Sequence, residues 1–182
     1  MTRHVLTFLA DSVQSLERTH GWAITTASAT PPTITMTYKN HIQLFFHPGA
    51  FLTTSTPTNR PNAPIGLTYI GSTQPLPTTL RFFLQLLRAS LQALPQSSTR
   101  VPSLLSLVSN GWTIALSVAE SERRLGIEGL TDSRIVSDER LSISSFILLP
   151  KLRTKVRVCF DILVAIGGDG DNMTLSETVE VG

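Results

Sequence analysis

The amphipathic helix predicted for residues 78–94 constrains the fold more than any other segment. Its apolar residues recur at spacings of three and four, and they are Leu80, Phe83, Leu84, Leu87, Leu91 and Leu94. Pro77 stands near the first turn, and Pro95 ends the helix because proline disfavours helical backbone in the residue before it. The apolar face of this helix has to be buried, so the neighbouring segments must supply a packing surface.

A second helix is predicted from about residue 103 to 125, after polar residues 96–100. Its expected buried stripe is Leu104, Leu105, Val108, Trp112, Ala115 and Ala119. Alternating apolar and polar residues predict strands on both sides of this helical pair. The expected strands are 22–28, 33–39, 42–46 and 65–70 before the helices, and about 133–138, 141–149, 154–166 and 173–181 after them.

This order of elements predicts an α+β fold with two tandem units, each an antiparallel four-stranded meander packed on helices. We expect residues 1–20 to be the end of an upstream helix or coiled coil, because their apolar residues keep helical spacing. Residues 21–95 are the expected first unit and residues 96–182 the second. Trp22 and Trp112 are expected in the cores.

Composition excludes several classes of protein. The chain has 182 residues, 41% of them hydrophobic and 15% charged, which favours a packed core over disorder. The net charge of +2 is too small to argue for nucleic acid as the main partner. A single cysteine, Cys159, excludes an internal disulfide framework and a cysteine-rich zinc site. No uninterrupted apolar run reaches the roughly 18 residues of a membrane span, so no membrane partner is expected.

The sequence GGDG at residues 167–170 has two interpretations. It matches the phosphate loop of nucleotide-binding, kinase-like enzymes, in which backbone N–H groups approach an anion at the start of a helix. However, the strand before it alternates like a half-solvated antiparallel strand, and the residues after it show no helical stripe. We therefore favour a hairpin turn and keep the kinase-like site as the alternative.

Four basic residues alternate along the chain after residue 150, and they are Lys151, Arg153, Lys155 and Arg157. A spacing of two places them on one face of an extended segment. They are either a solvated strand face or a partner-binding stripe that docks an acidic peptide. A DNA-binding module is the weaker alternative, because aromatic residues are not interleaved with these charges. No catalytic, cofactor-binding or metal-binding residues are predicted.

Several blocks of the sequence resemble the C-terminal region of the fungal Spc/Knl (Blinkin-type) kinetochore scaffold of the KMN network. They are GWAITTAS, TITMTYKNHIQLFFHPGAF, FFLQLLRASLQALPQSSTRVPSLLSLVSNGW and SFILLPKLRTKVRVCFDI, and the resemblance covers about residues 17–166. It implies two tandem RWD domains and a non-enzymatic role, with no cofactor and no small-molecule substrate. The family usually continues past the last strand into a closing helix, which the second unit would lack.

The resemblance also implies partners and a location. The family's C-terminal region anchors the scaffold to a subunit tail of the MIND (Mis-type) complex during chromosome segregation in mitosis. A helical segment just upstream pairs with a Zwint/Kre/Sos-type coiled-coil partner, and residues 1–20 would be the end of that segment. The expected location is the nucleus, at the kinetochore of the chromosome centromere.

Overall fold

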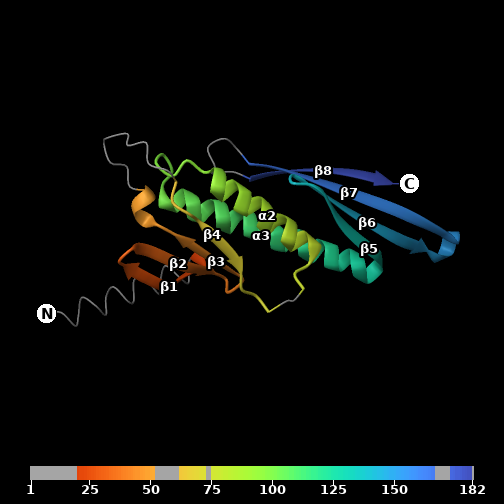
Figure 1. Cartoon of the computed structure of the whole chain (residues 1–182). Coiled ribbons are helices and arrows are strands. Elements are labelled where there is room, and N and C mark those ends of the chain that lie inside the picture. The colour runs from red at the N-terminus through yellow and green to blue at the C-terminus, as the bar shows by residue number, and fades with distance from the viewer. Residues whose placement is uncertain (1–19, 52–61, 73–74, 167–172, 182) are drawn as a thin grey trace. The chain divides into compact units, whose positions relative to one another are not determined.

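The computed structural model describes residues 20–51, 62–72, 75–166 and 173–181 (Figure 1). They fall into two compact units. The first unit runs to Ser72 and includes Pro95–Ser98, and the second contains the described residues of 73–94 and 99–182. Each unit holds one four-stranded antiparallel sheet, with strands in chain order.

The first unit is a meander of β1 (Trp22–Ala29), β2 (Pro32–Tyr38), β3 (Ile42–Phe46) and β4 (Gly66–Tyr69). Lys39 and Asn40 form the turn between β2 and β3, and both have positive φ, as a tight hairpin turn requires. On β3, alternation places Ile42, Leu44 and Phe46 on the buried face. The short 3-10 helix η1 (Pro48–Phe51) returns the Phe51 ring to within 5.8 Å of the Phe46 ring, centroid to centroid.

The buried side-chain amide of Gln96 hydrogen-bonds to the chain segment at Ala63, and both belong to the first unit. Gln96 is 3% exposed, and its side chain pairs with the backbone of Ala63 in both directions. The Ala63 N–H donates to Gln96 Oε1 over 2.9 Å, and Gln96 Nε2 donates to the Ala63 carbonyl oxygen over 2.6 Å. Because both polar groups of the amide are satisfied, this buried glutamine does not carry the penalty of an unpaired polar group.

The second unit combines α2 (Thr78–Ala93) and α3 (Val101–Glu128) with β5 (Gly129–Ser137), β6 (Arg140–Leu149), β7 (Thr154–Ile166) and β8 (Met173–Val181). The two helices pack against each other and contact the sheet, as Figure 1 shows. The 3-10 helix η2 (Pro150–Leu152) joins β6 to β7. Leu141, Ile143, Ile162 and Val164 are buried and share one face of the sheet by register, so the core of this unit lies on that face.

The predicted helices and strands agree with the structure, with two differences. Helix α3 continues to Glu128 and β5 begins at the next residue, whereas the sequence predicted a gap from 126 to 132. Within α3, Leu107 and Gly111 are buried, whereas Leu105 and Ala119 are half-buried. Trp22 and Trp112 are buried, as predicted.

The predicted division at residues 95 and 96 stays a prediction. The structure shows two four-stranded antiparallel sheets, but α2 and α3 both group with the second sheet. The expected upstream helix at residues 1–20 lies outside the described residues except for His20, which is helical.

Helix α3 also bears on the expectation that the chain has no membrane span. It is long and apolar enough to cross a membrane, because one 18-residue window reaches a mean hydropathy of 1.3. The expectation rested on the absence of a long uninterrupted apolar run. Polar residues such as Ser106 and Asn110 interrupt the run in this helix, but its mean hydropathy stays as high as that of a membrane span. A span is weakly supported, since core helices pass the same test and Leu104, Val108 and Trp112 are buried here.

Candidate functional site

The four basic residues do not share one extended face. Lys151 lies in η2, and Arg153 follows it with a φ of 49°, in the left-handed region. Strand β7 begins only at Thr154, which pairs with Leu149 of β6. The chain reverses direction over residues 150–153, so the prediction of a single four-residue stripe is wrong. Lys155 and Arg157 do share one face of β7, and all four side chains are exposed.

The strand register places apolar residues beside the two basic residues of β7. Arg157 pairs with Phe146 of β6, and Phe146 in turn pairs with Leu130 of β5. In the next row of the same face, Lys155 pairs with Leu148. Directly opposed side chains on one face of an antiparallel sheet lie about 5 Å apart at Cβ, so these pairs are in contact range.

The ring of Phe146 and the guanidinium of Arg157 form a cation–π pair. The guanidinium carbon lies 5.6 Å from the ring centroid. Phe146 remains 42% exposed, so the arginine covers only part of the ring. A planar guanidinium over an aromatic ring keeps donors free for a carboxylate, which a lysine ammonium cannot arrange in the same bidentate way.

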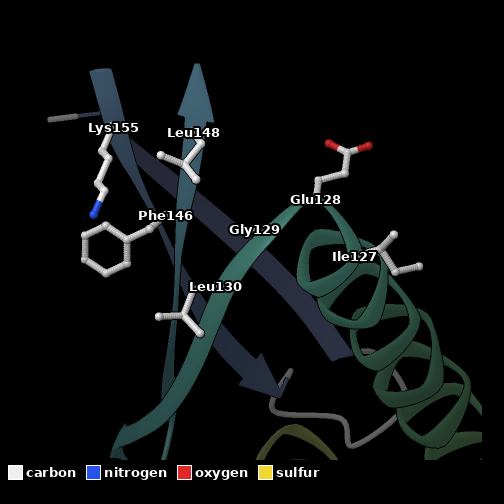
Figure 2. A pocket seen from close by; sticks show the side chains of 7 residues that line it. All are labelled: Ile127, Glu128, Gly129, Leu130, Phe146, Leu148 and Lys155. Carbon is white, nitrogen blue, oxygen red and sulfur yellow. The ribbon is translucent and has the colours of Figure 1, made fainter. Parts of the chain in front are cut away.

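Leu130, Phe146, Leu148 and Lys155 line a shallow hollow of about 580 Å³ in the second unit, and Arg157 lies beside it over the Phe146 ring. Figure 2 shows Leu130, Phe146, Leu148 and Lys155 grouped on neighbouring strands, with Ile127 and Glu128 at the end of α3. The four apolar side chains are well exposed, at 71% for Ile127, 75% for Leu130, 63% for Leu148 and 42% for Phe146. Exposed apolar side chains on one wall, with cations beside them, are the kinds of residue that bind a ligand or a partner protein.

The other end of the same face is polar. The Arg140 side chain hydrogen-bonds to the carboxylate of Asp161, and this bond and a second one from Ser142 hold the pKa of Asp161 below its ordinary value. Cys159 is half-buried on this face, between the positions of Arg157 and Asp161. Among the residues that the structure describes, no group of three or more His, Cys, Asp or Glu side chains could hold a metal ion.

The GGDG sequence lies at residues 167–170, outside the described residues. The structure does describe both of its flanks. β7 and β8 pair antiparallel up to Ile166 and Met173, so a strand follows this segment. A phosphate loop of the nucleotide-binding kind is followed by a helix, and that context is not met here.

Sequence reasoning found the two cations on β7 but missed the apolar part of the hollow. Leu130 and Ile127 were assigned to a connection between elements, because α3 was predicted to end too early. Phe146 and Leu148 carry a signal that could have found them: they are apolar residues on the outward phase of a strand whose inward residues are Leu141, Ile143 and Ser145.

The chain matches a known family. The family model described as Knl1 RWD C-terminal domain matches residues 1–119. The matched residues include β1–β4, α2 and α3 as far as Ala119, whereas β5–β8 lie beyond them. No curated protein matches the chain.

Proposed function

The chain belongs to the Knl1 RWD C-terminal domain family, and on this premise we propose that it is the docking module that anchors a kinetochore scaffold to the MIND (Mis-type) complex. Family membership indicates a kinetochore scaffold that acts through protein–protein interaction, at the centromere and without catalysis. The match over residues 1–119 is the single observation that carries the proposal.

The finer parts of the proposal follow from the sequence resemblance. The scaffold is of the fungal Spc/Knl (Blinkin) type, works in the nucleus within the KMN network, and carries two tandem RWD-like units at residues 21–95 and 96–182. Residues 1–20 would continue a helix that pairs with a Zwint/Kre/Sos-type coiled-coil partner. Lys151, Arg153, Lys155 and Arg157 are the proposed partner-binding residues, with Lys155 and Arg157 on the sheet and the other two in the turn before it.

No observation favours the kinase-like or DNA-binding alternatives. The strand after GGDG argues against a phosphate loop, and two of the four cations lie in a turn. The chain as a whole carries a net charge of only +2.

Calorimetric titration of the full chain with the purified MIND complex tests the proposed function. ATP and a short DNA duplex are the controls. We expect saturable binding to the complex and no heat with ATP. Loss of binding in a Lys155→Glu/Arg157→Glu variant with unchanged circular dichroism would support the basic residues as part of the site. Absence of binding by the folded wild-type chain would contradict the proposed function.

A further inference from the structure

The hollow of the second unit has an apolar wall that lies outside the buried core of the described residues. Leu130, Phe146 and Leu148 lie on the face opposite to the buried Leu141, Ile143 and Ile162, because their positions alternate along the strands. Exposed apolar groups are normal when scattered singly, but these three are cross-strand or diagonal neighbours. Clustering of this kind marks an interaction surface.

The charges around this wall are uneven. Residues 141–160 contain Lys151, Arg153, Lys155 and Arg157 and no acidic residue. Lys155 and Arg157 stand directly beside Leu148 and Phe146 in the register. The acidic residues around this face are Glu128, which lines the hollow at the end of α3, Asp132 on β5, which is followed by Arg134, and Glu180 on β8, which pairs with Cys159 and is therefore a diagonal neighbour of Arg157. Lys155 makes the β7 wall of the hollow positive and Glu128 makes the α3 wall negative, while Glu180 borders Arg157 on the side of β7 away from the hollow.

We propose that this hollow, lined by Leu130, Phe146, Leu148 and Lys155 and flanked by Arg157, binds an acidic peptide that places one large apolar side chain against Phe146 and its carboxylates against Lys155 and Arg157. The proposal rests on the proposed function and names the kind of partner segment that the docking module recognises. Anchor residues in desolvated pockets dominate peptide affinity, and a paired carboxylate gives orientation.

The carboxylate of Glu128 determines where the peptide carries its charges. The acidic residues of the peptide lie over β7, and the part of the peptide near Glu128 is neutral or basic, since like charges repel across a shared hollow. The Glu128 carboxylate disfavours a nucleic acid or an anionic membrane as the ligand, because a row of phosphates would extend from the positive β7 wall to the α3 wall, where Glu128 repels it. Neither of those ligands would use the apolar wall as an anchor for a single side chain.

A designed probe separates this inference from the proposed function. The probe is a labelled peptide with one central phenylalanine and aspartate and glutamate residues on one side of it. A matched peptide carries asparagine and glutamine at the acidic positions. Each is titrated against the full chain by fluorescence anisotropy, beside the MIND complex, a short DNA duplex and phosphatidylserine vesicles.

Variants of the hollow are compared with matched variants of the same sheet face. Phe146→Ser and the Lys155→Glu/Arg157→Glu pair test the anchor and the cations. Leu163→Ser and Arg134→Glu remove an exposed leucine and reverse an exposed charge on the same face away from the hollow. If circular dichroism shows that Phe146→Ser does not fold, Leu148→Ser replaces it, because Leu148 is more exposed.

We expect the acidic probe to bind the wild-type chain and to lose about tenfold or more in affinity with either hollow variant, as truncation of an anchor does. The neutral probe should bind as weakly as the variants do, and the two control variants should behave as wild type. Equal binding of both probes, unchanged binding by Phe146→Ser, or binding of DNA or vesicles in place of the peptide would overturn the inference.

The titration with the MIND complex distinguishes a failure of this inference from a failure of the proposed function. Binding of the MIND complex that neither hollow variant weakens, with no binding of the acidic probe, would overturn this inference and leave the proposed function standing. Binding of the probe to the hollow without any binding of the MIND complex would overturn the proposed function and leave the hollow as an acidic-peptide site.

Discussion

Gly129 and Phe146 approach so closely that no side chain fits between them. A Cβ atom on Gly129 would overlap the carbonyl oxygen of Phe146 and lie 3.1 Å from its carbonyl carbon. The Gly129 backbone is extended, with φ of −160° and ψ of 180°, so any residue could adopt its conformation. The glycine is therefore required by the short distance between the start of β5 and β6, at the wall of the hollow.

Gly129→Ala should destabilise the chain, because backbone of β6 has to move to admit the methyl group. We expect a loss of about 1–3 kcal/mol in the free energy of unfolding, as for other overpacked sites. Gly126→Ala is the matched control. Nothing lies within 4 Å of a Cβ there, and alanine favours helix over glycine, so a gain of about 0.5–1 kcal/mol is expected. Urea unfolding of both variants measures the difference, and a stabilised Gly129→Ala would contradict the steric account.

The fold was largely predictable because its local patterns are strong. The stripe of α2 and the alternation along β3 and β7 each specify one kind of element. The junction of α3 and β5 was not predictable, because a glycine such as Gly126 is typical of a helix C-terminus, whereas this helix continues to Glu128. Helix continuation there depends on packing of the whole helix, which outweighs the local propensity of one glycine.

The candidate site was predictable only in part. Charge patterning identified Lys155 and Arg157, but the same pattern wrongly extended the stripe through Lys151 and Arg153. A spacing of two shows that residues share a face only if the segment is a strand, and Pro150 begins a turn instead. The partners Leu130 and Phe146 come from other strands, so only the register brings them together.

The hydroxyl of Thr79 joins the two helices of the second unit. Thr79 is fully buried, and its Oγ1 donates a hydrogen bond to Oε2 of Glu122 on α3. Thr79→Val should lower the free energy of unfolding by about 1 kcal/mol, because the half-exposed Glu122 recovers part of the lost bond from water. Ser90→Ala is the control, since the Ser90 hydroxyl donates to the Leu86 carbonyl of its own helix. A double-mutant cycle with Glu122→Ala, which removes the acceptor, that showed no coupling would contradict a bond between the helices.

Glu120 makes helix stability depend on pH. Hydrogen bonds from Arg123 and Arg124 hold its pKa at about 2, below the ordinary value of 4.5. A lowered carboxyl pKa adds stability above pH 4.5, and that stability is lost as the pH falls from 4.5 towards 2. Glu120→Gln should therefore be less stable than wild type at neutral pH, and the difference should shrink as the pH falls to about 2 and disappear below it. Thermal unfolding across this range measures the gap, which added salt should narrow. A difference in stability at pH 2 as large as that at neutral pH would show that the charge is not its cause.

Arg157 should stabilise the sheet through Phe146 independently of any partner. Arg157→Met keeps an apolar stem but removes the cation over the ring, so we expect a loss of up to about 1 kcal/mol in the free energy of unfolding. Arg134→Met on β5 is the matched control, because in the described part of the chain Arg134 has no ring contact, and its effect should stay within about 0.5 kcal/mol. Proton chemical shifts of the Arg157 side chain report the ring contact directly. Equal stability of both variants, with Arg157 shifts at random-coil values in wild type, would show that the guanidinium does not rest on the ring and that its role is confined to binding.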